Sequence, residues 1–248
     1  MEKLENFKTL GFQLFSDAID KEELIKLQNS FDETISLDAK EIKGTYFYLA
    51  HELNDTFLNF LNYNPIQKYV DNILSDTSII HSFNGITLKP MNSNPIQNSV
   101  HRDTQRFSRD YLLSVQLIIM LDDFTKDNGG TYFLPKSHLI ESKPSEELFY
   151  KNAVQIEGKA GDIVLFDSLC WHAGGTNYTN SDRRALTLVY TRSFMKQQIE
   201  LTTNKIVEKK IRGNDKVKRL LGYNVRVPKN IDEFSLPFEE RLYKSNQG

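Results

Sequence analysis

Two histidines and one aspartate are the residues of this 248-residue chain best placed to bind a metal ion. His101 and Asp103 are two positions apart, and side chains two apart on a β-strand point to the same face. His172 is the best third ligand, because it follows a turn and a predicted buried strand at residues 161–167. Two imidazoles and one carboxylate on one face of a metal leave three of six positions open. That arrangement is typical of non-haem Fe(II) oxygenases.

A His-x-Asp pair alone is common by chance, and most such pairs are ordinary surface residues, so the surrounding sequence matters. The second histidine lies 71 residues downstream, and Arg183 follows it by 11 residues at the start of a predicted strand. Where 2-oxoglutarate chelates the iron, its distal carboxylate needs a fixed positive partner, and the planar guanidinium holds a carboxylate with two parallel hydrogen bonds. Arg184 would point to the opposite face of the strand.

Composition excludes several classes of protein. The chain has 31 Lys and Arg against 33 Asp and Glu, a net charge of −2, and 39% hydrophobic residues, which does not fit disorder. A single cysteine excludes an internal disulfide framework and a cysteine-based zinc cluster. No apolar run approaches the roughly 18 residues of a membrane span, and the first residues lack a signal-peptide pattern. We therefore expect a cytoplasmic protein with no nucleic-acid or membrane partner.

The predicted secondary structure that must position these residues is largely helical before about residue 79 and largely β-strand after it. Residues 11–15 alternate like a short strand, and residues 21–31 have helical spacing with Asp20 as a plausible N-cap. Residues 54–74 predict a second helical region, interrupted at Pro65. From about residue 79 short strands predominate, at residues 79–89, 99–103, 112–121, 131–134, 163–166 and 185–192.

Helices followed by many short strands predict a mainly β fold with flanking α-helices. We expect the core to be a double-stranded β-helix, the cupin-like jelly roll in which two sheets enclose a cavity. One domain would span residues 1–248. Its parts are a helical support at about 16–75, the jelly-roll core at about 79–195 and a basic segment at about 200–248.

The predicted strand at residues 112–121 is apolar except for Ser114 and Gln116, which lie on one face because they are two apart. A buried polar side chain without a partner costs roughly 1 to 3 kcal/mol, so this face is better explained as the lining of a polar cavity. We expect Gln116 to point into the barrel. Val115, Leu117 and Ile119 would pack into the core on the other face.

The C-terminal segment is strongly basic. Between Lys205 and Lys229 there are nine Lys and Arg against Glu208 and Asp215. The simplest interpretation is a solvated surface with a short helix near residues 216–221. The alternative is that the segment helps to bind an anionic substrate or partner.

Taken together, the motifs resemble those of the phytanoyl-CoA dioxygenase family of Fe(II)/2-oxoglutarate-dependent oxygenases. The His-x-Asp and the distal histidine–arginine motifs are specific when combined, whereas the N-terminal similarity is generic. The matching segments are residues 11–15 with the acidic helix that follows, 100–103, 121–123, 127–130, 134–138, 161–162, 172–177 and 183–186. Three positions depart from the family pattern. Lys136 stands where glycine is usual, Gly174 where serine is common, and Ile118 where an aromatic residue is often found.

The resemblance implies a role for each matching residue. His101, Asp103 and His172 would be the iron ligands, and Arg183 the partner of the 2-oxoglutarate carboxylate. Further cosubstrate contacts would be Gln116, Thr131 and Lys89. Candidate substrate contacts are Arg106, Phe107, Trp171, Asn177 and Tyr46, the last with Tyr48 in a possible lid. We expect His138 to be structural and His51 and His81 to be ordinary polar residues.

The implied activity uses Fe(II), 2-oxoglutarate as cosubstrate and O2 to hydroxylate or otherwise oxidise an unactivated C–H bond of a small-molecule metabolite, releasing succinate and CO2. Asp103 favours this over halogenation, because halogenating relatives carry a small residue there. Family members act on acyl-CoA thioesters, amino acids, phosphonates, sugars and natural products. Two other classes stay open. One is a non-catalytic jelly-roll protein that binds a small molecule or a partner, and the other is a hydrolase or isomerase with a different metal.

Overall fold

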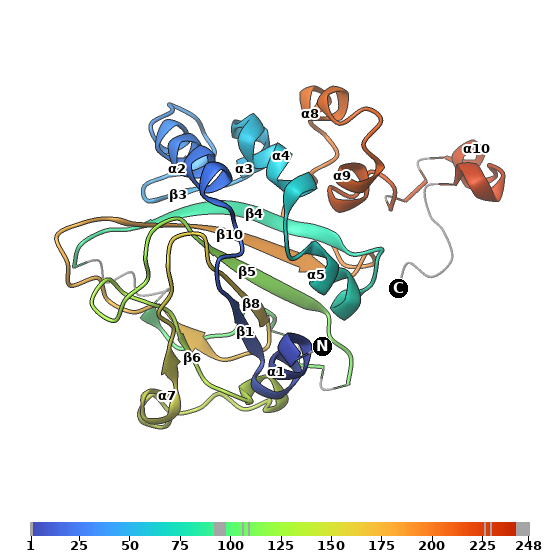
Figure 1. The fold of residues 1–248 in the computed structure, drawn as a ribbon. Helices are drawn as coiled ribbons and strands as arrows, with labels where there is room; N and C mark the ends of the chain where they lie inside the picture. Colours follow the sequence, from blue (N-terminus) through green and yellow to red (C-terminus); the bar gives the residue numbers. More distant parts are fainter. Residues whose placement is uncertain are drawn as a thin grey trace.

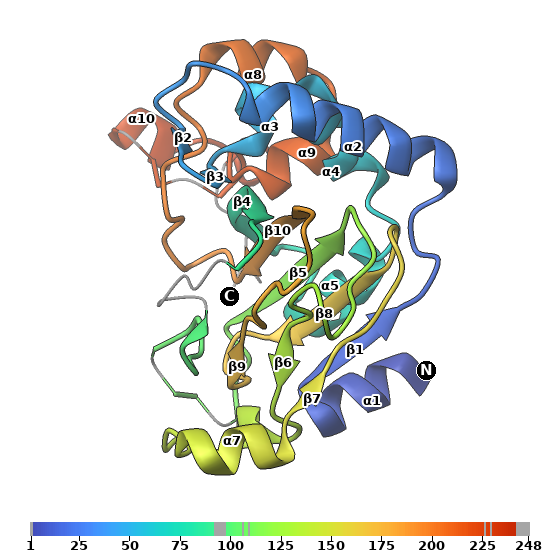
Figure 2. The ribbon, with the colours of Figure 1, turned by 90° about the vertical axis from the view of Figure 1, so that its left-hand side faces the viewer.

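Two antiparallel sheets form the centre of the protein in the computed structural model, which describes residues 2–91, 98–105, 107–108, 110–225, 227–228 and 230–241. A seven-stranded sheet has the order β1-β8-β5-β10-β4-β3-β2, and a three-stranded sheet has the order β7-β6-β9 (Figure 2). The strands are β1 (Phe12–Phe15), β2 (Ile42–Lys43), β3 (Tyr46–Phe47), β4 (Ile79–Leu88), β5 (Ser114–Met120), β6 (Tyr132–Phe133), β7 (Val154–Gln155), β8 (Ile163–Asp167), β9 (His172–Ala173) and β10 (Arg183–Thr191).

Helices cover the face of the large sheet that points away from the small sheet. In Figure 1, α2, α3, α4, α8 and α9 lie on one side of β4 and β10, while β6 and α7 lie on the other. The helices are α1 (Glu2–Leu10), α2 (Lys21–Ile35), α3 (Ala50–Leu53), α4 (Asp55–Tyr63), α5 (Gln67–Leu74), α7 (Glu146–Asn152), α8 (Lys205–Lys210), α9 (Asp215–Leu220) and α10 (Ile231–Phe234), with 3-10 turns at Ser137–Leu139 and Phe238–Glu240.

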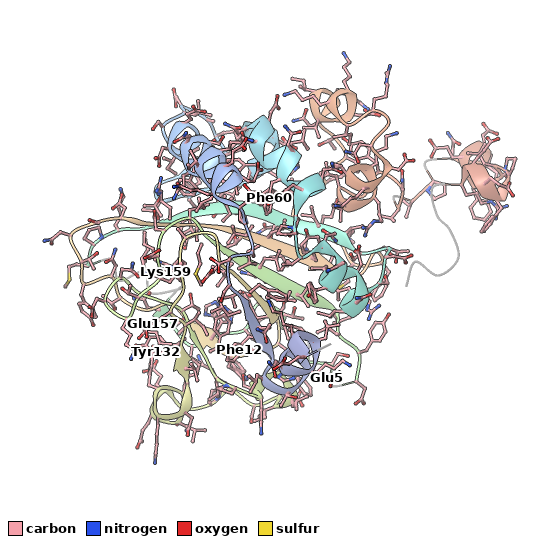
Figure 3. The ribbon with its side chains drawn as sticks, viewed as in Figure 1. Glu5, Phe12, Phe60, Tyr132, Glu157 and Lys159 are labelled. Atoms are coloured by element: carbon pink, nitrogen blue, oxygen red, sulfur yellow. The ribbon has the colours of Figure 1, made fainter. Side chains whose placement is uncertain are left out.

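The two faces of the large sheet contribute to two different cores. Val115, Leu117 and Ile119 of β5 belong to the larger core, which they share with Phe60 of α4. The opposite face of β5 contributes Ile118 to a second core, which includes Phe12 and residues of the small sheet. Figure 3 labels Phe60 near the helices and Phe12 near β1. This alternation fixes which side chains of β5 can reach the space between the sheets.

The predicted fold class is confirmed, with helices flanking a two-sheet core. The helix predicted at residues 21–31 is also confirmed, and the carboxylate of Asp20 caps it by accepting the Glu23 N–H at 2.9 Å. The interruption predicted at Pro65 separates α4 from α5.

The strand predicted at residues 99–103 is wrong. In this segment only His101 makes a β-bridge, to His172. The chain leaves the ladder directly afterwards, because the backbone N–H groups of Asp103 and Thr104 both donate to the carbonyl of Ser168. A single bridge therefore replaces the strand on which the His-x-Asp spacing was interpreted.

A tight turn precedes β8, as the Gly161-Asp162 pair predicts. Gly161 has a φ of +96°, a conformation that favours glycine, and a Cβ there would lie 3.2 Å from the carbonyl oxygen of Ile19. The carboxylate of Asp162 accepts hydrogen bonds from the N–H groups of Asp17 and Lys159. The turn thereby fixes the start of the strand that leads to Ser168 and His172.

Helices α8 and α9 of the basic C-terminal segment pack on the helical side of the large sheet (Figure 1). Val207 of α8 and Val217 of α9 are buried in the larger core. Lys210 pairs with Asp55 of α4, and Arg219 pairs with Asp71 of α5. These charges therefore lie across the sheet from the space between the two sheets. Arg226 and Lys229 lie outside the described residues.

No helix in the described part of the chain is both long enough and apolar enough to cross a membrane.

Candidate metal centre

His101, Asp103 and His172 converge at one end of the space between the two sheets. One ligand atom from each of them can be chosen so that all three lie within 4.8 Å of one another. The Nε2 atom of His101 lies 3.8 Å from one Asp103 carboxylate oxygen, and the Nε2 atom of His172 lies 3.7 Å from the other. The two imidazole rings are 4.3 Å apart between centroids. Two imidazoles and a carboxylate at this spacing match the donor set of a facial metal site.

Backbone carbonyls orient both imidazoles. The Nδ1 atom of His101 lies 2.7 Å from the carbonyl oxygen of Ser99, and that of His172 lies 3.0 Å from the carbonyl oxygen of Cys170. A carbonyl accepts only from a protonated nitrogen, so in each neutral ring Nε2 carries the free lone pair. Such a bond to the second nitrogen is usual for a metal-binding histidine. Burial also lowers the pKa of His172, which favours the neutral form that binds metals.

A cavity of about 240 Å³ connects the triad to Arg183, and we call it the metal cavity. Four of the predicted cosubstrate and substrate contacts line it, namely Gln116, Thr131, Arg183 and Tyr46. Tyr48 lies there too, with its ring stacked on Tyr46 at 6.4 Å between centroids. Gly174 also lines the cavity, at the position where a serine is common in the family. The structure thus brings residues from β3, β4, β5, β9 and β10 to one space.

Arg183 is buried at the inner end of β10, with 6% of its surface exposed. Its guanidinium carbon lies 3.8 Å from the centroid of the Phe124 ring. Within the described residues its side chain has no hydrogen bond or ion pair, and its Nε is buried without a partner. Burial lowers the pKa of Arg183 to about 10, while the nearby Asp122 opposes that shift. A buried cation of this kind is unfavourable until an anion pairs with it.

Arg184 occupies the opposite face of the same strand. Its guanidinium donates two hydrogen bonds to Asp122 and further bonds to Asp32 of α2. Hydrogen bonding to Asp122 raises the pKa of Arg184 above its usual range. The contacts therefore make Arg184 a structural link between β10 and α2.

Lys89 and Asn177 do not line the metal cavity, and their contacts explain why. The ammonium group of Lys89 pairs with Asp182 in a partly exposed position. Asn177 is fully buried, and its side-chain amide donates to the carbonyl oxygens of Leu88 and Ser181. Both side chains are engaged in holding the turn before β10, which does not support direct contact with cosubstrate or substrate.

Trp171 and Phe107, two more of the predicted substrate contacts, do not line the metal cavity either. Trp171 is buried in a small core with Val100 and Phe149. The guanidinium of Arg102 lies 5.1 Å from the Trp171 ring and 5.7 Å from the Phe107 ring. These contacts indicate packing. Arg106 lies outside the described residues.

The three histidines outside the triad have different surroundings. The Nε2 atom of His138 lies 3.1 Å from the carbonyl oxygen of Lys8, which fits a structural residue. His51 is fully buried, neither ring nitrogen has a hydrogen bond within the described residues, and burial lowers its pKa to about 4. It is therefore a core histidine and not an ordinary polar residue. The Nδ1 atom of His81 contacts the carbonyl oxygen of Lys196.

Sequence reasoning missed three polar residues of the cavity wall, namely Asn98 and the pair formed by Asn84 of β4 and Thr187 of β10. Asn84 and Thr187 face each other in the strand register, next to Ile118 of β5. The signal was present for this pair, because each is a polar residue inside a mostly apolar strand, as Gln116 is. That reasoning was applied only to β5.

Comparisons with known proteins agree with this geometry. The sequence profile described as phytanoyl-CoA dioxygenase (PhyH) matches residues 9–185. The Mycobacterium tuberculosis protein Rv1501 is 38% identical over 200 residues, covering 77% of this chain and 72% of that protein. The dioxygenase trt7 of Aspergillus terreus is 33% identical over 97 residues, covering 35% of this chain and 32% of that protein.

Solved structures share the fold at low sequence identity. The structure of HygX from Streptomyces hygroscopicus, with nickel and 2-oxoglutarate bound, has a TM-score of 0.67 at 14% identity and covers 81% of this chain and 90% of that one. SnoN, a non-haem α-ketoglutarate-dependent epimerase from nogalamycin biosynthesis, has a TM-score of 0.63 at 16% identity and covers 77% of this chain and 82% of that one.

Proposed function

The chain belongs to the phytanoyl-CoA dioxygenase family, whose profile covers residues 9–185, and we propose that it hydroxylates or otherwise oxidises a C–H bond of a small molecule with release of succinate and CO2. When bound, Fe(II) and 2-oxoglutarate supply the chemistry, which is O2 activation coupled to oxidative decarboxylation of the cosubstrate. The protein supplies binding, orientation and exclusion of water.

His101, Asp103 and His172 are the proposed metal ligands. The donor set suits Fe(II), and both imidazoles are held with Nε2 free toward the carboxylate of Asp103. Asp103 also bears on the type of reaction, because a carboxylate here occupies the position that halogenating relatives leave small. We therefore propose oxidation without halogen transfer.

The observation that carries the proposal is the buried, unpaired guanidinium of Arg183 in the cavity that contains the triad. A dicarboxylate that chelates the metal at one end presents its second carboxylate at a distance. Arg183 is the proposed partner of that carboxylate, with a bidentate pair in place of a lone buried charge. Gln116 and Thr131 line the same cavity and are proposed as further cosubstrate contacts.

Formation of succinate from 2-oxoglutarate tests the function. Purified protein is incubated under air with Fe(II) and 2-oxoglutarate, with and without candidate metabolites, and succinate is quantified. The proposal expects succinate only when Fe(II), 2-oxoglutarate and O2 are all present, and faster formation with a true substrate. Zn(II) in place of Fe(II) is a matched control, since Zn(II) has no redox chemistry.

The Asp103→Ala and Asp127→Ala variants make the assay specific to the site. Asp127 is exposed on the loop after β5 and does not line the metal cavity. Succinate formation should disappear in Asp103→Ala and persist in Asp127→Ala. Equal rates in both variants, or succinate formed without Fe(II), would reject the proposed function. A protein that only binds small molecules would form no succinate under any of these conditions.

A further inference from the structure

A second cavity, of about 500 Å³, adjoins the metal cavity at Asp103. The two cavities share four lining residues, Asn84, Asp103, Gln116 and Thr187. We call the second cavity the polar chamber. Its volume is within the range of about 300 to 1,000 Å³ that is usual for small-molecule sites. A molecule in the polar chamber would lie beside the metal ligand Asp103, whereas Arg183 lines only the metal cavity.

The floor of the polar chamber is one end of the large sheet. Strand register places Thr187 of β10 opposite Asn84 of β4, and Thr191 of β10 opposite Ser114 of β5. Val189 lies between them, opposite Gln116 on one side and Ser82 on the other. The inward side chains of three adjacent strands are therefore hydroxyls and amides around a single valine.

This polarity is confined to the end of the sheet near Asp103. Farther along the same face, the three strands carry Ile86, Ile118 and Ala185, which belong to the core between the sheets. The opposite face of the same strands is apolar throughout this region, with Phe83, Leu117 and Leu188 buried. Folding alone explains the apolar face. It does not explain a floor of polar side chains that faces inward.

Several of these side chains have no hydrogen-bond partner within the part of the chain that the structure describes. Asn84, Thr187 and Ser82 make no side-chain hydrogen bond there, nor does Gln198 at the chamber edge. The hydroxyl of Ser168 is fully buried without a partner. Buried polar groups are nearly always satisfied by protein, water or ligand. Ser82 and Ser168 are the buried members of this set, Asn84 and Thr187 are half-buried, and Gln198 is exposed. Together they are donors and acceptors available to a molecule bound in the chamber.

The described lining of the polar chamber carries little charge. Asp103 is its one carboxylate, no lysine or arginine of the described residues lines it, and the described basic residues of α8 and α9 lie across the sheet. His81 also lines the chamber, with its Nδ1 atom against the carbonyl oxygen of Lys196. An anionic substrate would therefore meet one imidazole but no ammonium or guanidinium group of the described residues, and an apolar substrate would leave the hydroxyls and amides unpaired.

We propose that the polar chamber is the substrate site and that its substrate is a neutral, polyhydroxylated molecule, such as a sugar or cyclitol ring. This inference rests on the proposed function for the reaction that the bound molecule undergoes. Binding of that molecule in the polar chamber does not require turnover and can be measured separately. Neutral hydroxyl and amide side chains pair with ring hydroxyls as both donors and acceptors. The expectation of an anionic substrate is not supported by the described lining.

Ligand binding without turnover tests the proposal. The protein is loaded with Zn(II) and 2-oxoglutarate, and saturation-transfer NMR records binding of methyl α-D-glucopyranoside and myo-inositol. Glucose 6-phosphate, coenzyme A and hexanamide are the anionic and apolar comparison probes. The neutral polyols should bind most strongly. No transfer to either polyol, or stronger transfer to coenzyme A or hexanamide, would overturn the proposal.

Two variants test whether the polyols bind in the polar chamber. Ser82→Ala/Thr187→Val removes two hydroxyls from the chamber floor and should weaken polyol binding roughly tenfold. Its melting temperature should not fall, because neither hydroxyl has a hydrogen-bond partner among the residues that the structure describes. The matched control is Thr9→Val/Ser16→Ala, which removes the same two groups from exposed positions, Thr9 in α1 and Ser16 directly after β1. This control variant should bind the polyols like the unaltered protein.

The outcomes separate this inference from the proposed function. Polyol binding that depends on Ser82 and Thr187 supports the chamber even if no succinate is ever formed, in which case the proposed function alone fails. Succinate formation combined with polyol binding that is unchanged in Ser82→Ala/Thr187→Val rejects the chamber and leaves the oxygenase intact.

Discussion

Arg183 and Arg184 are neighbours on β10, and their guanidinium groups lie on opposite faces of the large sheet. The Arg184 group is bound by Asp122 and Asp32, whereas the Arg183 group lies over Phe124 without an ion pair in the described residues. Strand alternation explains the opposite directions. The difference in pairing explains the difference in proposed role, since one arginine joins elements of the fold and the other faces a cavity.

Replacing Arg183 with alanine should weaken 2-oxoglutarate binding strongly. Loss of a buried bidentate ion pair typically costs about 2 to 5 kcal/mol, which corresponds to a rise in Kd of roughly 30-fold or more. Titration calorimetry with the metal-loaded protein measures this. Thermal stability should not fall by a comparable amount, because within the described residues the guanidinium has no hydrogen bond or ion pair to lose.

Arg184→Ala is the matched control for that experiment. It should lower the melting temperature, because Asp122 and Asp32 lose their partner, and it should change the Kd for 2-oxoglutarate little. If Arg184→Ala weakens 2-oxoglutarate binding more than Arg183→Ala does, the assignment of the two faces of β10 is reversed.

Gln116→Leu should separate stability from activity. The Gln116 side chain lines both cavities and makes no hydrogen bond within the described residues, so an apolar replacement should leave the melting temperature unchanged or raise it. Turnover or 2-oxoglutarate affinity should fall, because a cavity amide is lost. A clear loss of stability with full turnover would show that Gln116 supports the fold and not the site.

Much of this fold follows from local patterns in the sequence. Alternation of apolar residues predicted β5, β8 and β10 to within two residues at each end. The N-cap Asp20 and the break at Pro65 placed the helices before the sheet. The failure of the strand prediction at residues 99–103 has a long-range cause. There the backbone bonds to Ser168, a residue far along the chain whose position no local pattern encodes.

The site was predictable where chemistry restricts the residue type. A facial triad needs two imidazoles and a carboxylate, which the proposed ligands His101, Asp103 and His172 supply, and an arginine is suited to hold a carboxylate. The substrate roles predicted for Asn177 and Trp171 stay predictions, and neither residue lines the metal cavity. Amides and indoles serve packing and turns as readily as they serve ligands. The contacts of Asn177 with Leu88 and of Trp171 with Val100 depend on tertiary structure. The polar floor around Thr187 was visible only after strand register had aligned three strands.

The buried carboxyl group of Asp167 should make stability depend on pH. Burial raises the pKa of Asp167 to about 7 from its ordinary value of 3.8. The folded protein then holds a proton that the unfolded chain has released between about pH 4 and pH 7, so the free energy of unfolding should fall as pH rises through this window.

Asp167→Asn tests that effect. An asparagine oxygen can still accept the Leu169 N–H, which lies 2.8 Å from the Asp167 carboxylate. The variant should be more stable than the unaltered protein at pH 8, by up to about 4 kcal/mol, and its stability should vary less between pH 4 and pH 7. Urea unfolding at several pH values measures both quantities. Parallel curves for the two proteins would contradict the assigned shift.

Lys136 departs from the glycine of the family pattern and carries a backbone strain. Its φ is +66°, a region that costs a non-glycine residue about 1 to 2 kcal/mol. Glycine loses more conformational entropy on folding, at a free-energy cost of about 0.5 to 1 kcal/mol, and this cost offsets part of the stability gained by relieving the strain. Lys136→Gly should therefore raise the free energy of unfolding by about 0.5 to 1 kcal/mol. Lys151→Gly, inside α7, should lower it by about 1 kcal/mol.

Equilibrium Fe(II) binding in the absence of oxygen tests the central claim most directly. The unaltered protein should bind one Fe(II) per chain at His101, Asp103 and His172. His172→Ala and Asp103→Ala should each weaken that affinity by more than about 100-fold, since even loss of a residue that only orients a metal ligand costs about 10- to 100-fold. Asp127→Ala should bind like the unaltered protein. Unchanged Fe(II) stoichiometry and affinity in both His172→Ala and Asp103→Ala would contradict the assignment of this triad as the metal centre.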